Sequence, residues 1–97
     1  MDDLTISYAH KGHVGAWFID LDGKRVGEMA YEDTAPDTIT ILHTEVGPEL
    51  RGRGAGLKLV EAGVAWAREH KKKVIAQCAF AKATIEKHPG LQDVLAK

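Results

Sequence analysis

The sequence predicts an α/β (α+β) domain in which a mixed, mostly antiparallel five-stranded sheet carries two helices, in the order β-β-β-β-α-β-α. Three observations predict this class. The first half alternates polar and apolar residues between turn formers, a later segment has helical periodicity, and a short β-branched run follows that segment. A chain of 97 residues suits one hydrophobic core. We therefore expect residues 1–97 to form a single domain.

Four strands are predicted in the first half, at about residues 4–10, 13–20, 24–33 and 37–46. Turn formers separate them at Lys11-Gly12, Asp22-Gly23 and Ala35-Pro36-Asp37. The Asp-Gly pair supplies the positive backbone dihedrals that a tight hairpin requires. The second and third strands are therefore expected to be antiparallel neighbours.

The pattern changes to a helix after Gly47-Pro48, which ends the fourth strand. From Leu57 onward, apolar residues recur at the spacing of one helix face, namely at Leu57, Val60, Val64 and Ala67. Residues 74–79 are short and partly β-branched and predict a fifth strand, reached by a parallel crossover. Residues 80–88 predict a second helix that ends before Pro89, and the last residues predict one short helical turn.

Composition limits the classes of function. A formal net charge of -1 provides no general attraction to nucleic acid or to an anionic membrane. A single cysteine, Cys78, cannot form an intrachain disulfide, and the start of the chain lacks the apolar run of a signal peptide, so we expect a cytoplasmic protein. No apolar run is long enough to span a membrane. The histidines and Cys78 show no spacing typical of a metal site, and we predict no metal.

The most informative segment is Arg51-Gly52-Arg53-Gly54-Ala55-Gly56, which lies between a predicted strand and a predicted helix. Glycines let backbone amides approach a ligand closely, and the start of a helix attracts negative charge. This combination is typical of a phosphate site, to which Arg51 and Arg53 would add charge-assisted bonds. The alternative is a flexible loop with two solvated arginines. The glycine spacing matches neither the nucleotide-triphosphate loop nor the dinucleotide-binding fingerprint.

The same segment resembles a known motif. Arginine or glutamine, two residues, glycine, one residue, then glycine or alanine is the coenzyme A pyrophosphate motif of the GNAT N-acetyltransferase superfamily, and Arg51, Gly54 and Gly56 match it. Further segments resemble the small stand-alone YjdJ-type GNAT-like family over roughly residues 5–95. They are His43-Thr44-Glu45-Val46, Val74-Ile75, Cys78-Ala79-Phe80 and Lys87-His88-Pro89. Members of that family lack helices that larger relatives insert after the first strand, and the turn at Lys11-Gly12 likewise leaves no room for them.

The resemblance implies a minimal GNAT-like fold in which the fourth and fifth strands splay apart around acetyl-coenzyme A, the acyl donor. The implied cofactor-binding residues are Thr44, Val46 and the loop Arg51, Gly52, Arg53, Gly54, Ala55 and Gly56. The implied reaction is acetyl transfer to a primary amine.

Three residues are candidates for the chemistry. His43 is the leading proton acceptor because imidazole titrates near neutrality, and strict alternation puts it on the face of Ile39 and Ile41. Glu45 would orient that imidazole or attract a cationic amine. Cys78, on the fifth strand, would protonate the leaving thiolate or carry the acetyl group. Each residue has a structural alternative. His43 could be a hydrogen-bonded core histidine, Glu45 a solvated residue at the end of a strand, and Cys78 a buried small hydrophobic residue.

Two other functions compete with the N-acetyltransferase. One is a binding module that holds coenzyme A without turnover, and the other, weaker because the chain is mildly acidic, is nucleic-acid binding through Arg51 and Arg53. We expect a small-molecule acyl donor and an amine acceptor, either a small molecule or a protein lysine, as partners. Nucleic acid and membrane are not expected, and the chain is expected to be a monomer or a weak dimer.

Overall fold

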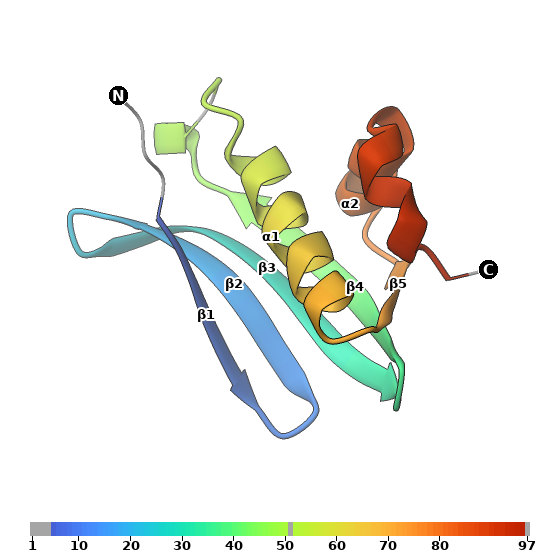
Figure 1. Cartoon of the computed structure of the whole chain (residues 1–97). Coiled ribbons are helices and arrows are strands. Elements are labelled where there is room, and N and C mark those ends of the chain that lie inside the picture. The colour runs from blue at the N-terminus through green and yellow to red at the C-terminus, as the bar shows by residue number, and fades with distance from the viewer. Residues whose placement is uncertain (1–4, 51, 97) are drawn as a thin grey trace.

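The computed structural model describes residues 5–50 and 52–96 and has the predicted class and order of elements. Five strands form one sheet in the order β1-β2-β3-β4-β5, with bounds Ile6–Lys11, Val14–Leu21, Lys24–Ala35, Thr38–Val46 and Lys73–Ala76. The first four strands pair antiparallel and β5 pairs parallel with β4. The helix α1, Ala55–Glu69, lies across one face of the sheet, and α2, Ala79–Lys87, lies beside β4 and β5 (Figure 1). The short 3-10 helices η1, Pro48–Leu50, and η2, Pro89–Val94, complete the fold.

The predicted hairpin between β2 and β3 is confirmed. Asp22 and Gly23 have φ of 50° and 78°, the left-handed pair that closes a two-residue turn. The bounds of the first four strands agree with the prediction to within two residues.

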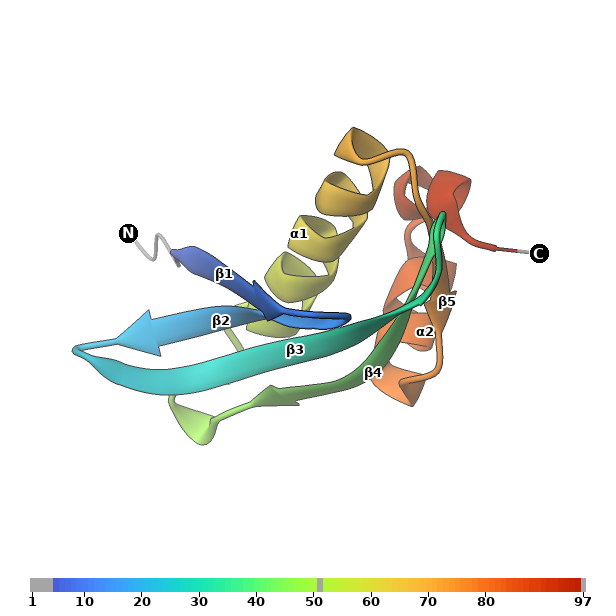
Figure 2. The ribbon, with the colours of Figure 1, turned by 90° about the horizontal axis from the view of Figure 1, so that it is seen from below.

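The core lies between α1 and the sheet. On α1 the buried residues include Leu59, Val60 and Val64, packed against strand residues such as Ile19 and Met29. The predicted face of α1 was nearly right, but Leu57 is only half-buried and Leu59 takes its place. Figure 2 shows α1 on one side of β1–β3; among the described residues, no helix covers the other side. We call this uncovered side of β1–β4 the open face.

Three of the large aromatic residues pack in or against the core. Trp17 and Tyr31 are buried on the α1 side, with ring centroids 4.9 Å apart, and the half-buried Trp66 packs against both. Phe18 differs. It alternates to the open face, where the Arg25 guanidinium lies 3.7 Å from its ring centroid.

The lysine segment after α1, at residues 71–73, is more than a solvated link. Lys72 is half-buried and pairs with Asp33 at 3.2 Å, tying the end of α1 to β3.

None of the helices formed by residues 5–50 and 52–96 is both long and apolar enough to cross a membrane.

The fifth strand is shorter than predicted. It ends at Ala76, where the backbone amides of Gln77 and Cys78 both donate to the carbonyl of Ile41. Cys78 is therefore not a strand residue; it has extended backbone dihedrals and is the N-cap of α2. Since β5 pairs only with residues 38–41 of β4, the rest of β4 extends past the end of β5.

A bulge in β4 changes the face of His43. Ala30 pairs with His43 and Tyr31 pairs with Ile41, so Leu42 is an extra residue on β4. Cross-strand partners share a face, and consecutive residues of β3 point to opposite faces. The prediction that His43 lies with Ile39 and Ile41 is therefore wrong, because the bulge turns His43 to the open face.

Candidate functional site

The start of α1 forms an amide cradle, as the sequence predicted. The helix begins at Ala55, two residues earlier than expected, with Gly54 as its N-cap at φ 70°. Lys58 N–H donates to the carbonyl of Gly54 at 3.0 Å and closes the first turn, so the amides before it point out of the helix start. Gly52 has φ of 77°, and a Cβ added at Gly52 or Gly54 would meet open space. Gly52 and Gly54 thus offer backbone, and not side chains, to any ligand.

Arg53 and Ala55 of this loop differ from the glycines in their burial. Arg51, predicted to bind pyrophosphate, lies outside the described residues. Arg53 is half-buried, and the Ala55 side chain is buried in the core, so only its amide belongs to the cradle. The described cofactor candidates of the loop, residues 52–56, therefore form a turn of backbone at the start of α1.

Gly56 is in contact with α2. A Cβ added at Gly56 would overlap the ring of Phe80, in the first turn of α2. The Phe80 side chain is nevertheless 46% exposed, so its ring lies on the surface of the first turn of α1 and is free to swing outward. The Phe80 ring therefore lies between the first turns of α1 and α2. The sequence shows that Phe80 is close to Cys78 along the chain, but it does not show that Phe80 contacts Gly56.

Cys78 lies at the start of α2, two residues before Phe80, and faces the α1 side of β4. Its thiol donates to Thr44 Oγ1 at 3.6 Å, and Thr44 pairs with Met29, a residue of the α1 face. Burial raises the pKa of the thiol, but the hydrogen bonds that the thiolate accepts from the backbone of Ala81 and from the Thr44 hydroxyl outweigh burial and hold the pKa below its ordinary value. A cysteine at the start of a helix is thereby made a stronger acid and a better nucleophile.

His43 and Glu45 lie on the open face instead. Glu45 pairs directly with Glu28 of β3, and His43 Nε2 lies 3.6 Å from Glu28 Oε2. The predicted shared face of His43 and Glu45 is confirmed, whereas Glu28 was missed by sequence reasoning. No local signal could have identified Glu28, because its contact depends on the register of two strands and on the bulge at Leu42.

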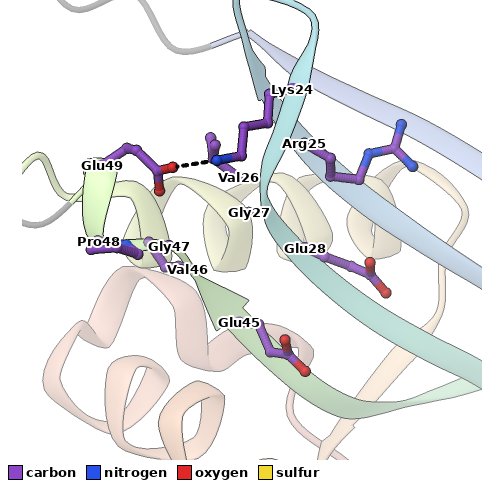
Figure 3. Close-up of a pocket in the computed structure, with 10 residues that line it drawn as sticks. All are labelled: Lys24, Arg25, Val26, Gly27, Glu28, Glu45, Val46, Gly47, Pro48 and Glu49. Carbon is purple, nitrogen blue, oxygen red and sulfur yellow. Dashed lines mark hydrogen bonds and ion pairs between the residues drawn. The ribbon is translucent and has the colours of Figure 1, made fainter.

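A groove of about 460 Å³ borders this side of β4, between the beginning of β3 and the end of β4. Figure 3 shows Glu28 and Glu45 projecting from neighbouring strands, and Lys24 joined to Glu49 by an ion pair of 3.0 Å. Residues of α1 and α2 do not line this groove. It is therefore separate from the amide cradle.

Because β5 ends early, one edge of β4 is accessible from both faces of the sheet. Beyond Ile41 the edge of β4 is not covered by β5, so Thr44 with Cys78 on one face and His43 with Glu45 on the other flank the same uncovered edge. A thioester on that edge would be accessible from both faces. Within residues 5–50 and 52–96, no three His, Cys, Asp or Glu side chains gather in a way that would hold a metal ion.

Comparisons with known proteins agree with this arrangement. The model of the GCN5-related N-acetyl-transferase family matches residues 16–94. The solution structure of a GCN5-like candidate N-acetyltransferase from Staphylococcus aureus is 37% identical, with a TM-score of 0.75, over 99% of this chain and 91% of that one. No curated protein gives a significant match.

Larger proteins share the fold at lower identity. A ribosomal-protein-alanine N-acetyltransferase from Brucella melitensis is 18% identical with a TM-score of 0.63, over 90% of this chain and 64% of that one. A candidate streptothricin acetyltransferase from Bacillus anthracis, in complex with acetyl coenzyme A, is 18% identical with a TM-score of 0.58. That match covers 68% of this chain and 39% of the other. The chain thus spans less than two thirds of these larger proteins.

Proposed function

The chain belongs to the GCN5-related N-acetyltransferase family, and on that basis we propose that it transfers the acetyl group of acetyl-coenzyme A to a primary amine. The observation that carries this proposal is the uncovered edge of β4. It lies beside a helix start suited to phosphate, with a hydrogen-bonded thiol on one face and an imidazole on the other.

The described residues fit coenzyme A. Gly52, Gly54, Ala55 and Gly56 would hold the pyrophosphate through backbone amides, supplemented by Arg53 and Arg51. Thr44 and Val46 would line the pantetheine arm along β4, where the strand lacks β5 as a partner. The coenzyme supplies an acetyl group already activated as a thioester.

The two faces of β4 divide the chemistry. His43 accepts the proton that the attacking amine must lose, and Glu45 attracts the cationic amine to the open face. Cys78, on the opposite face, donates its proton to the departing thiolate, a task that suits a thiol whose pKa is below its ordinary value. The alternative role of Cys78 is nucleophilic, with the acetyl group passing through its sulfur before reaching the amine.

Kinetics and intact mass separate these routes. We expect acetyl-coenzyme A to bind in calorimetry and to raise the melting temperature. His43→Ala should slow turnover by about a hundredfold or more, the usual contribution of one general base, whereas the turn residue variant His13→Ala should not. Cys78→Ser should keep substantial activity. A labile acetyl adduct on Cys78 that forms and decays as fast as turnover would replace direct transfer with the nucleophilic route.

A coenzyme A-binding module without turnover is the second candidate, and one observation favours it. The chain spans only part of the larger acetyltransferases, so it has few elements with which to enclose an acceptor. Binding of acetyl-coenzyme A without acetyl transfer to any amine tested, and without effect of His43→Ala, would establish this alternative.

The remaining assignments are also proposals. We propose that the chain belongs to the YjdJ-type group within the family, acts as a monomer or weak dimer, and takes an amine of a small molecule or a protein lysine as acceptor. A reducing cytoplasm suits Cys78, whose free thiol is required in either role. We do not assign it nucleic acid or membrane partners.

A further inference from the structure

Glu28 and His43 face each other across neighbouring strands of the open face. His43 Nε2 lies 3.6 Å from Glu28 Oε2, although Glu28 pairs directly with Glu45 and His43 with Ala30. The contact is therefore diagonal, a separation that long side chains can bridge. It exists only because the bulge at Leu42 turns His43 away from α1.

The pair is open to an incoming molecule. The side chains of His43 and Glu28 are 51% and 39% exposed, so this is not a core histidine held by buried polar groups. An ion pair with that exposure contributes little to folding. The contact is therefore available for a role other than stabilising the fold.

We propose that Glu28 is a positioning residue that holds the His43 imidazole in the tautomer that accepts the amine proton. The inference rests on the proposed acetyl transfer. Because the carboxylate faces Nε2, it favours the neutral tautomer with its proton on Nε2 and leaves Nδ1 as the acceptor nitrogen. Contacts of this kind are often long without substrate and shorten when substrate binds.

The proton and electron balance follows from this tautomer. The amine nitrogen forms a bond to the acetyl carbon, and its proton moves to Nδ1 of His43. The resulting imidazolium donates from Nε2 to the Glu28 carboxylate, which balances its charge. The carbon-sulfur bond breaks with its electron pair going to sulfur, and the coenzyme thiolate takes a proton from Cys78 or from water. His43 then releases its proton to solvent.

Other charged groups on the open face define the controls. Glu45 lies opposite Glu28 and also belongs to the proposed machinery, so it is not a control. Glu32 is on the same strand and the same face as Glu28, and it pairs with Thr40, away from His43. Glu32→Gln therefore makes the same change of charge on the same surface without touching the imidazole.

Two measurements test the proposal. In nitrogen-15 spectra of the imidazoles, with the His43 signals assigned from a His43→Gln variant, the neutral form of the wild type should carry its proton on Nε2. Glu28→Gln should shift His43 toward a mixture of tautomers, and Glu32→Gln should not. In acetyl transfer to n-propylamine, putrescine or a blocked lysine amide, Glu28→Gln should lower kcat roughly tenfold, part of the usual contribution of a general base. The KM for acetyl-coenzyme A should be unchanged, and Glu28→Asp should recover part of kcat.

Each outcome decides between alternatives. Unchanged His43 signals in Glu28→Gln overturn the positioning role, and so does a changed tautomer with full kcat. An equal loss of kcat in Glu32→Gln would mean that overall surface charge, and not the contact, matters. If the wild type transfers acetyl to none of the three amines, the proposed function fails. The spectra then still decide whether Glu28 orients His43.

Discussion

Replacing Gly56 with alanine tests why α1 has a glycine in its first turn. The backbone φ there is not positive, so the requirement is one of space: an added Cβ would overlap the Phe80 ring. Alanine gains about 1 kcal/mol of helix propensity over glycine. Overpacking costs about 1–3 kcal/mol, and because Phe80 is 46% exposed, its ring can shift outward at a cost below the top of that range, about 2 kcal/mol. We expect Gly56→Ala to lower the free energy of unfolding by about 1 kcal/mol.

The same change in a Phe80→Ala background should have the opposite sign. With the ring absent, the overlap disappears and only the helix propensity remains, so Gly56→Ala should stabilise that variant by about 0.5–1 kcal/mol. The interaction energy of the cycle is then about 1.5–2 kcal/mol. Urea unfolding followed by the fluorescence of Trp17 and Trp66 measures all four proteins.

Gly63→Ala is the matched control on the same helix. An added Cβ there would lie 2.7 Å from Met29 Cε, and Met29 is fully buried, so the variant should be destabilised equally in both backgrounds. Equal destabilisation by Gly56→Ala with and without Phe80 would refute the reasoning. In that case Gly56 is required by the α1 backbone itself. Calorimetry with acetyl-coenzyme A adds a second readout: if Gly56→Ala weakens binding even without Phe80, the glycine also serves the ligand.

Three further predictions follow from single contacts. Cys78 should react with iodoacetamide with a midpoint below that of an ordinary thiol, about pH 8.5, and Thr44→Val should move that midpoint upward. Burial and the hydrogen bond with Tyr8 raise the pKa of Tyr31, so its contribution to stability is fully present below about pH 10 and is lost as pH rises further. Ultraviolet titration of the folded protein should show one late phenolate, and an ordinary midpoint for Tyr31 would contradict this. Lys72→Met should destabilise by about 1–2 kcal/mol in urea unfolding, because it leaves the half-buried Asp33 carboxylate unpaired, and it should cost much less in an Asp33→Asn background.

The elements that the sequence predicted well depend on local patterns. Asp22-Gly23 closes its hairpin through its own dihedrals, and the glycine-rich loop leads into a helix as its spacing indicates. The fifth strand was predicted too long because Val74 to Ala79 is apolar apart from Gln77. Its end at Ala76 depends on the Ile41 carbonyl, far away in the sequence, which accepts from the two amides that follow.

The candidate residues were proposed from residue types and motifs. The structure places Cys78, His43 and Glu45 at the same stretch of β4, residues 43–45. The relation between them was not predicted. Alternation assigned His43 to the helix side, since a period of two takes no account of an inserted residue such as Leu42.

By itself the sequence determined the order of the elements, the turn at Asp22-Gly23 and the backbone cradle at Gly54, because each depends on residues that are neighbours along the chain. Only the tertiary structure decided that His43 meets Glu28 on one face while Cys78 meets Thr44 on the other. These contacts join residues 15 and 34 positions apart, and they depend on strand register and on where β5 stops. Register is determined by the packing of the whole sheet against α1, and no segment of the chain carries that information alone.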